Sequence, residues 1–267
     1  MPKKFSYQEL AAAAKNFPSS TMLGQGGTGR VYKGFLTDSG RIERIWASYE
    51  HAKEDFMAEL KIMSQLECRN VVSLIGWCID QGELLLVYDY MFNGSLDKYL
   101  FGNNRMHLSW NLFGNNRMHL SWNLRYNVVL SLASALLYLH EDSGQCIPHR
   151  DVKSANVMLD FNFNAKLGDF GAAHSQTIKV VGAFGYIAPE YYHEGRASTK
   201  SDIYSFGIVA LEIASGRRKH KDEESHLGLV PWVWELHGAG KTLDAADERL
   251  NMDFNAHEME GLLIVGL

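Results

Sequence analysis

Three short motifs follow one another in the second half of the 267-residue chain, and they constrain its fold more than any other feature. They are HRDVKSAN at 149–156, GDFG at 168–171 and APE at 188–190. Asp151 can accept the proton of a hydroxyl group, and Lys153 can neutralise charge on a phosphoryl group. Asn156 and Asp169 carry the hard oxygen ligands that Mg²⁺ prefers. A solvated charged turn would explain HRD alone, but it does not explain the ordered set.

A glycine-rich motif, GQGGTG at 24–29, precedes these three. Gly24, Gly26 and Gly29 let the backbone approach a phosphate without an intervening Cβ. The pattern GxGxxG is weak evidence alone, because dinucleotide-binding folds and plain hairpins also contain it. In a dinucleotide-binding fold the third glycine opens a helix, whereas the RVYKGFL that follows here reads as a strand. Val31 completes the longer form of a flap over phosphates. A dinucleotide-binding oxidoreductase is excluded because a strand follows the glycines and no acidic residue closes a βαβ unit.

Hydrophobic periodicity divides the chain into two parts. Short strand-like segments fill the first ninety residues, with one helix expected at 54–66. Long amphipathic helices are expected at 122–142 and 198–216, the second ending at a glycine that suits a C-cap. We therefore expect an α+β protein with two lobes. The expected divisions are a lead-in (1–19) and a domain (20–267) that comprises a β-rich N-lobe (20–90) and a larger helical C-lobe (91–267).

Composition limits the binding partners and the cellular compartment that we expect for this domain. The net charge of −5 does not suggest binding to nucleic acid. The three cysteines form no CxxC pair, which fits a reducing compartment and argues against a zinc site. The apolar run at 71–79 is too short to span a bilayer, and the start of the chain has no signal-peptide pattern. We expect a cytoplasmic chain without a membrane span.

One segment is written twice: LFGNNRMHLSWN occupies both 100–111 and 112–123. A solenoid needs several longer repeats, because a single short unit cannot bury a face of its own. Only one copy can lead directly into the helix expected at 122–142. Lengthening a surface loop costs only about 0.6 kcal/mol per doubling of its length. We interpret the second copy as a tolerated insertion, with a functional doublet as the alternative.

With its motifs in this order, the chain resembles the protein kinase family, and most closely the plant receptor-like kinases of the legume-lectin type. FSYQEL, LLLVYDYMFNGSLDKYLF, LASALLYLHE and SANVMLD carry the closer likeness. The resemblance extends from about Phe5 to Leu267. It implies a bilobal kinase fold in which ATP and Mg²⁺ bind between the lobes. It also implies transfer of the γ-phosphate to serine or threonine hydroxyls of proteins.

The resemblance implies roles for individual residues. Asp151, Lys153 and Asn156 would be catalytic, and Asn156 and Asp169 would hold the metal. Tyr88 would be the gatekeeper and Asp202 the buried aspartate beneath the catalytic loop. Contacts to the nucleotide are implied for residues of the flap, the N-lobe helix, the hinge and the C-lobe: Leu23, Gly24, Gly26, Gly29, Val31, Glu59, Asp89, Met91 and Met158.

The sequence departs from the family at the nucleotide clamp. The third-strand lysine that pairs with the helix glutamate falls on Glu43, and the small residue over adenine falls near Arg41. A carboxylate at position 43 would repel both Glu59 and the phosphates. No lysine lies between Gly34 and Ala52, so the alternatives are the arginines at positions 30, 41 and 44.

Two further departures lie in the C-lobe. Ala183 stands where the family has a threonine whose hydroxyl bonds to Asp151 and Lys153. The chain ends before the family's terminal helix and its arginine, so we expect Glu190 of APE to be a buried carboxylate without that partner.

Two hypotheses follow. The first is a serine/threonine kinase domain, impaired by Glu43, that acts on protein substrates on the cytosolic side of a membrane. The alternative is a pseudokinase that binds receptor kinases as a scaffold.

Overall fold

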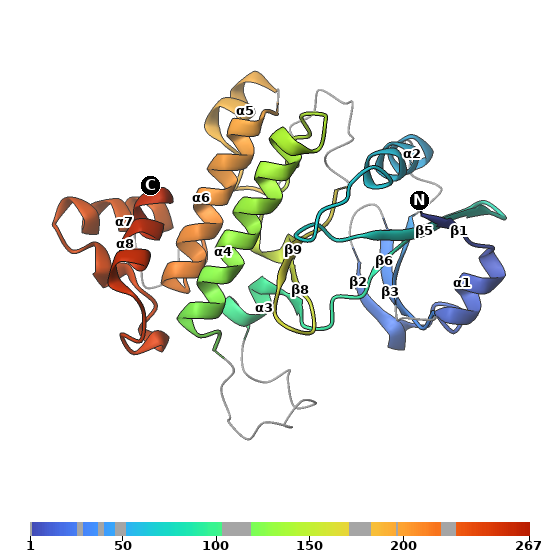
Figure 1. Cartoon of the computed structure of the whole chain (residues 1–267), viewed down its shortest axis with the longest axis horizontal. Coiled ribbons are helices and arrows are strands. Elements are labelled where there is room, and N and C mark those ends of the chain that lie inside the picture. Colours follow the sequence, from blue (N-terminus) through green and yellow to red (C-terminus); the bar gives the residue numbers. More distant parts are fainter. Residues whose placement is uncertain are drawn as a thin grey trace.

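The computed structural model describes residues 2–25, 29–36, 40–45, 52–102, 119–170, 183–195, 197–219 and 228–267. Figure 1 shows a strand-rich N-lobe at one end of the molecule and a helical C-lobe at the other. The expected α+β architecture with two lobes is confirmed. Within the described residues, no helix is long and apolar enough to cross a membrane.

A six-stranded sheet forms the N-lobe, in the order β1-β5-β6-β4-β3-β2. Its strands are β1 (Lys3–Lys4), β2 (Met22–Gln25), β3 (Gly29–Gly34), β4 (Gly40–Ile45), β5 (Leu74–Asp80) and β6 (Glu83–Asp89). β1 pairs with β5 in parallel, and the other neighbours are antiparallel. The turn between β5 and β6 places Gln81 and Gly82 at positive φ, the conformation of a tight hairpin.

Helices cover both faces of this sheet. Helix α2 (Ala52–Met63) packs on the inner face, towards the C-lobe, and α1 (Tyr7–Ala13) packs on the outer face. This explains why β6 reads as a continuous apolar run rather than an alternating one. Leu84 and Leu86 join the inner core, whereas Leu85 and Val87 join the outer one.

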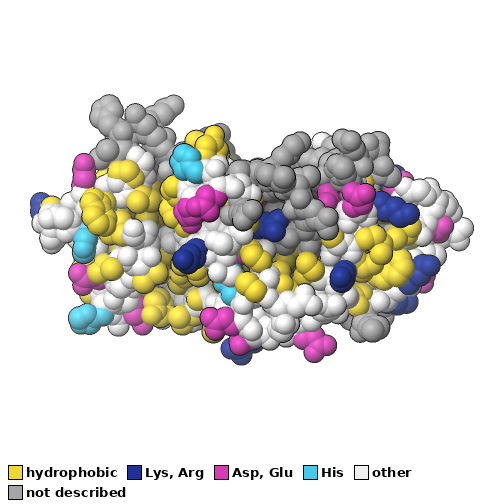
Figure 2. All heavy atoms as spheres, turned by 90° about the horizontal axis from the view of Figure 1, so that it is seen from above, with side chains coloured by type: hydrophobic (Ala, Val, Ile, Leu, Met, Phe, Trp, Pro, Cys, Tyr) yellow, Lys and Arg dark blue, Asp and Glu magenta, His cyan; other side chains and the backbone are white. Residues whose placement is uncertain are grey.

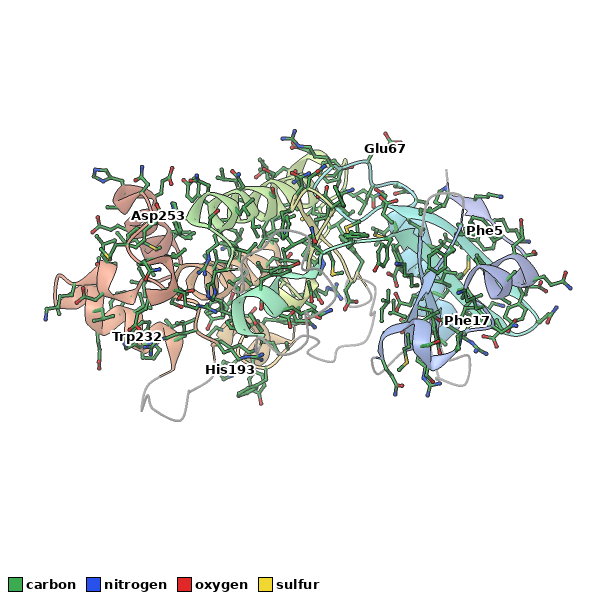
Figure 3. All side chains as sticks on the ribbon, turned by 90° about the horizontal axis from the view of Figure 1, so that it is seen from below. Phe5, Phe17, Glu67, His193, Trp232 and Asp253 are labelled. Carbon is green, nitrogen blue, oxygen red and sulfur yellow. The ribbon has the colours of Figure 1, made fainter. Side chains whose placement is uncertain are left out.

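The lead-in is therefore part of the N-lobe. Ser6 caps α1, and its hydroxyl accepts the Glu9 N–H at 3.2 Å while the Glu9 carboxylate accepts the Ser6 N–H at 2.8 Å. A short 3₁₀ turn, Ser19–Thr21, then leads into β2. Figure 3 shows Phe5 and Phe17 beside α1, at the end of the molecule opposite Trp232.

The C-lobe contains a small sheet and several helices. The sheet has the order β7-β8-β9, formed by β7 (Gly94–Ser95), β8 (Val157–Leu159) and β9 (Ala165–Leu167). The helices are α3 (Leu96–Phe101), α4 (Trp122–Leu137), α5 (Pro189–Glu194), α6 (Thr199–Ser215), α7 (Leu229–Gly238) and α8 (Ala256–Val265). A π-helical turn, Tyr138–Asp142, continues α4, and short 3₁₀ turns span Ser154–Asn156, Thr242–Ala245 and Glu248–Leu250.

Helices α4 and α6 form the centre of the C-lobe core (Figure 1). The apolar stripe of the helix expected at 122–142 is buried throughout: Val128, Val129, Leu132, Leu136 and Leu139. Helix α6 ends at Gly216, which has φ 66° as its predicted C-cap role requires. Gly266, just after α8, lies so close to α6 that an added Cβ would stand 2.5 Å from Leu211 Cγ. These contacts fix the position of α6 beneath the loop that carries the HRD motif.

The duplicated segment joins α3 to α4, as the sequence predicted. Its first residues end α3, and its last residues precede and begin α4. Positions 103–118 lie outside the described residues. The insertion interpretation therefore stays a prediction.

Candidate active site

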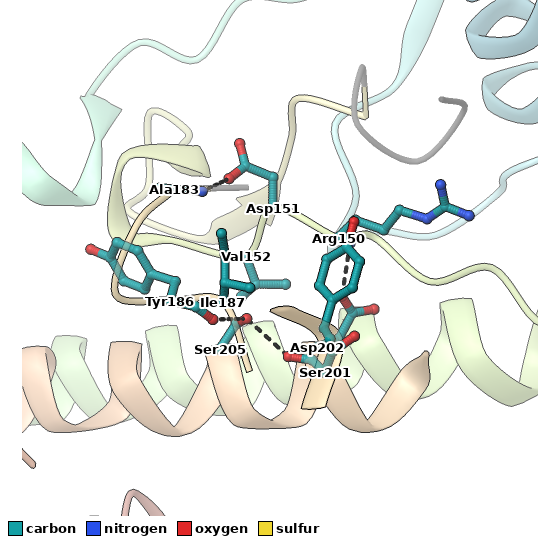
Figure 4. A pocket seen from close by; sticks show the side chains of 10 residues that line it. Arg150, Asp151, Val152, Ala183, Tyr186, Ile187, Ser201, Asp202 and Ser205 are labelled. Atoms are coloured by element: carbon teal, nitrogen blue, oxygen red, sulfur yellow. Dashed lines mark hydrogen bonds between the residues drawn. The ribbon is translucent and has the colours of Figure 1, made fainter. Parts of the chain in front are cut away.

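Asp202 organises the loop that carries the HRD motif. Its carboxylate, 1% exposed in the first turn of α6, accepts the backbone N–H groups of His149 at 2.7 Å and Arg150 at 2.8 Å. The same carboxylate lies 2.9 Å from His140 Nε2. Arg150 has φ 72°, an unusual conformation for a non-glycine residue, and the hydrogen bond to Asp202 helps to hold it (Figure 4).

The Asp151 carboxylate receives donors at both oxygens. Oδ2 accepts from Lys153 Nζ at 2.5 Å and from Asn156 Nδ2 at 3.1 Å. Oδ1 accepts the backbone N–H of Ala183 at 3.1 Å (Figure 4). The loss of the threonine hydroxyl at position 183 therefore does not leave Asp151 without a donor from this segment, because the backbone amide supplies one. The structure thus brings together Asp151, Lys153 and Asn156.

The residues around Asp169 are joined to the same loop. The Gly168 N–H donates to Asn156 O at 3.0 Å, and the Phe170 ring meets the His149 ring at 4.6 Å between centroids. Burial lowers the pKa of His149, which favours the neutral ring. Asp169 stands between these contacts with φ 65°, and its side chain is exposed.

The segment at 183–188 is tied to α6 by contacts that the sequence analysis missed. The Tyr186 hydroxyl donates to Glu212 at 2.9 and 3.0 Å, and the Ser205 hydroxyl donates to Tyr186 O at 2.7 Å. Lys219 Nζ donates to Phe184 O. One signal was available: Glu212 is the only charged residue in the apolar stretch 203–216. Burial raises the pKa of Glu212, so its surroundings favour the uncharged form.

The described parts of the glycine motif form a strand, a turn and a strand, as expected. Leu23 and Gly24 lie on exposed β2, and Gly29 begins β3, where Val31 is half-buried. A Cβ at Gly29 would stand 2.4 Å from Arg44 O, so this position requires glycine for close strand packing. Gly26 lies outside the described residues.

Glu43 occupies a strand position on the sheet's inner side. It pairs with Val31 of β3 and Leu86 of β6, and the inner-core residue Ile45 follows two positions later on the same strand. The buried carboxylate of Glu59, on α2, instead accepts a hydrogen bond from the Tyr88 hydroxyl. A phenol therefore supplies one donor to the helix glutamate, which the family pairs with a lysine.

The structure shows the contacts of two of the three arginines that could replace the missing lysine. Arg44 forms an ion pair with Glu83 and lies over the Phe17 ring on the outer face of the sheet, so it does not replace the missing lysine. Arg30 is exposed and donates to Gln25 at 2.9 Å. The side chain of Arg41 is not among those that the structure describes.

The hinge residues connect the two lobes. Asp89 ends β6 and lies 3.7 Å from Lys166 Nζ, and Met91 is buried. Met158, on β8, is half-buried and pairs with Lys166 of β9.

One expectation is wrong: Glu190 at the start of α5 is exposed, so water can solvate its carboxylate, and no buried charge needs an arginine there.

Residues 18–229 match the family described as protein tyrosine and serine/threonine kinase. The L-type lectin-domain containing receptor kinase IX.1 of Arabidopsis thaliana is 46% identical over 100% of this chain and 41% of its own length. The receptor kinase VIII.1 of the same type and organism is 45% identical over 100% of this chain and 38% of its own length. The chain thus spans about two fifths of the length of these relatives.

Proposed function

Because the chain belongs to the protein tyrosine and serine/threonine kinase family, we propose that it transfers the γ-phosphate of ATP to serine or threonine hydroxyls of proteins, at a reduced rate. The donor set around Asp151 is the observation that carries this proposal. A carboxylate that is oriented by Lys153, Asn156 and the Ala183 amide is positioned to accept the proton of an incoming hydroxyl. Lys153, adjacent to that carboxylate, supplies positive charge for the transferring phosphoryl group.

The donor chemistry fits a magnesium ion. Asn156 Nδ2 donates to Asp151 O at 2.9 Å as well as to Asp151 Oδ2, so its amide oxygen remains for a cation. The exposed carboxylate of Asp169 supplies a second hard oxygen. Magnesium bound by these two residues would neutralise charge on the ATP phosphates.

The nucleotide would lie between the flap and the hinge. We propose Leu23, Gly24, Gly26, Gly29 and Val31 as the roof of this site. The remaining proposed contacts come from the hinge, β8 and α2: Asp89, Met91, Met158 and Glu59.

Glu43 is the reason to propose a reduced rate. A carboxylate on the inner side of β4 adds negative charge where the family has an ammonium that binds phosphates. Weaker phosphate binding lowers the fraction of protein molecules that hold a nucleotide at a given nucleotide concentration.

Phosphate transfer from labelled ATP to serine- and threonine-containing proteins tests the proposal. We expect slow transfer that Asp151→Asn lowers by about two to four orders of magnitude. Asp142→Asn, at an exposed position, is the control and should leave the rate unchanged. A wild-type rate no higher than that of Asp151→Asn would contradict the proposal.

A scaffold without catalysis is the second candidate function, favoured by Glu43 alone. Glu43→Lys distinguishes the two. If the wild type is inactive and Glu43→Lys restores transfer, the natural chain is a pseudokinase. If the wild type is already active, the scaffold alternative fails.

The relatives named above are receptor kinases, and we propose that this chain likewise acts within receptor-kinase signalling, on the cytosolic side of a membrane. Its partners would be protein substrates or other receptor kinases. We also propose the expected limits of the kinase domain, 20–267 with lobes at 20–90 and 91–267, and the lead-in at 1–19 adds β1 and α1 to the first of these lobes.

A further inference from the structure

Lys219 is a cation fixed at the edge of the segment that contacts Asp151. Its Nζ donates to Phe184 O and lies 3.4 Å from the centroid of the Tyr186 ring. Its backbone N–H donates to Glu212 Oε1 at 3.2 Å. Three contacts, to the segment at 183–186 and to α6, therefore hold Lys219 in one place.

This ammonium lies close to the proposed base. Phe184, whose carbonyl it binds, directly follows Ala183, whose N–H donates to Asp151 Oδ1 at 3.1 Å. The Cα atoms of neighbouring residues lie about 3.8 Å apart, so the Lys219 ammonium and the Asp151 carboxylate contact adjacent residues of one short segment. The Phe184 side chain is 79% exposed, which shows that solvent reaches this segment. Figure 4 shows Asp151, Ala183 and Tyr186 arranged above α6.

No carboxylate lies within ion-pair distance of the Lys219 ammonium among the residues that the structure describes. Glu212 is the nearest candidate, but its oxygens accept the Tyr186 hydroxyl and the Lys219 backbone N–H. Desolvation lowers the pKa of Lys219 to about 8, and the charge of Lys153 acts in the same direction, while Glu212 and Asp151 oppose it. The ammonium is therefore mostly charged at neutral pH, and no carboxylate of the described residues forms an ion pair with it.

The overall charge of the molecule does not supply a comparable preference for anionic ligands. Basic and acidic side chains are interspersed over the face in Figure 2, and the net charge is −5. A local cation beside the acceptor site thus matters more than the long-range field. An anion on a bound ligand would give Lys219 a counter-ion that the described residues do not supply.

We propose that Lys219 makes the chain select acceptor segments that carry a carboxylate or a phosphate within roughly three residues of the acceptor hydroxyl, at about 3.3 Å per extended residue. This rests on the proposed function, because it assumes that the acceptor hydroxyl binds at Asp151. The recognised chemistry is an anion. A carboxylate side chain and an earlier phosphorylation are two sources of it.

Binding of fluorescent peptides to the full chain, followed by anisotropy, tests the proposal. The peptides share one sequence around a serine and differ only at the neighbouring positions, which carry Asp, Asn, Lys or phosphoserine. At pH 7 we expect the Asp and phosphoserine peptides to bind at least about threefold tighter than the Asn peptide, the size of an exposed ion pair. A preference for phosphoserine alone would identify prior phosphorylation as the source.

Substitutions at position 219 assign the preference to this residue. Lys219→Glu should reverse it in favour of the Lys peptide, whereas Lys241→Glu, the same charge change at an exposed position, should leave it intact. Between pH 7 and pH 9 the wild-type preference should fall as Lys219 loses its proton. Lys219→Arg should retain the preference at pH 9, because arginine stays charged.

Each result bears on the proposal, including results obtained with the wild type alone. Equal binding of the Asp, Asn and Lys peptides at pH 7, absence of binding, or a preference that survives Lys219→Glu would overturn it. Peptide preference without phosphate transfer would leave this inference standing while the proposed activity fails. Phosphate transfer without any preference between peptides would leave the proposed activity standing while this inference fails.

Discussion

At the scale of single residues, the buried carboxylate of Glu59 has an unusual partner. The Tyr88 hydroxyl, a neutral donor, supplies a hydrogen bond to the buried carboxylate of Glu59. A phenol satisfies an oxygen without cancelling its charge, unlike a lysine. Tyr88 is itself buried on β6, so it fills space behind the proposed nucleotide site and fixes α2 at the same time. The chain thus keeps its helix glutamate in place although position 43 is acidic.

Tyr88→Phe should destabilise the protein by about 1–3 kcal/mol, because it removes one donor from a buried carboxylate while keeping the ring. Urea denaturation at neutral pH measures this free energy of unfolding. Tyr192→Phe, on an exposed ring, is the matched control and should change the free energy by less than about 0.5 kcal/mol. Equal stability of Tyr88→Phe and the wild type would show that the phenol does not hold Glu59.

Glu212 predicts a dependence of stability on pH. Burial raises its pKa above the ordinary value of 4.5, against hydrogen bonds from Ser154 and Tyr186 that lower it. The folded state therefore binds this proton more tightly than the unfolded state. Its stabilising contribution is complete below pH 4.5 and is lost as pH rises through the folded pKa.

The variant Glu212→Gln lacks this proton and should lack this pH dependence. We expect the wild type to lose unfolding free energy relative to Glu212→Gln between pH 5 and pH 7, as measured by urea denaturation at both values. A wild type that gains on the variant as pH rises would mean that Glu212 is stabilised as a carboxylate.

At the scale of elements, α1 covers the outer face of the N-lobe sheet, and β1 extends this sheet beside β5. Leu10 of α1 is fully buried against that face, together with residues such as Ile42 and Leu85. The helix is only seven residues long, so it owes its stability to this packing and to the capping box at Ser6 rather than to its length.

Leu10→Ala should cost about 2–5 kcal/mol, because alanine keeps the helix propensity but leaves a cavity in the outer core. Gln8→Ala, on the exposed side of the same helix, controls for changes in helix formation. Urea denaturation of both variants checks the expectation. If Leu10→Ala were as stable as Gln8→Ala, the lead-in would be a loosely attached tail and not part of the lobe.

Elements with strong local signals were predictable from the sequence. The apolar stripe of α4, the glycine that ends α6 and the Gln81–Gly82 hairpin turn each determine local backbone geometry. Contacts between distant segments carry no such signal. Lys219 lies 35 residues from Phe184 in sequence, and the backbone N–H of Ala183 replaces a hydroxyl without any trace in the side-chain pattern. The expected buried Glu190 failed for the same reason, since exposure depends on packing around α5 and not on the APE motif.

At the scale of the whole molecule, the C-lobe is fastened by a buried ion network. Arg125 of α4 is 1% exposed, lies 2.7 Å from Asp247 Oδ2 and donates to Ile213 O of α6 at 2.9 Å. Arg249 also pairs with Asp247, at 2.6 Å, and donates to Leu100 O at the end of α3. The proposed metal and base residues belong to this lobe, whereas the flap and Glu43 belong to the N-lobe. A nucleotide at the proposed site would therefore contact a C-lobe half held by this network and an N-lobe half altered by Glu43.

Thermal unfolding in the presence of ATP and Mg²⁺ reports on both halves together. A ligand that binds only the folded state adds about 2.7 kcal/mol at one hundred times its dissociation constant. We expect a small rise in the unfolding midpoint for the wild type and a larger one for Glu43→Lys at the same ATP concentration, because the ammonium replaces repulsion of the phosphates by attraction. Asp169→Asn should reduce the part of the rise that requires Mg²⁺, and Glu248→Lys, an exposed position with the same charge change, should behave as the wild type does. If Glu43→Lys and the wild type responded equally, the acidic residue on β4 would not face the phosphates, and the reason for proposing a slow enzyme would be lost.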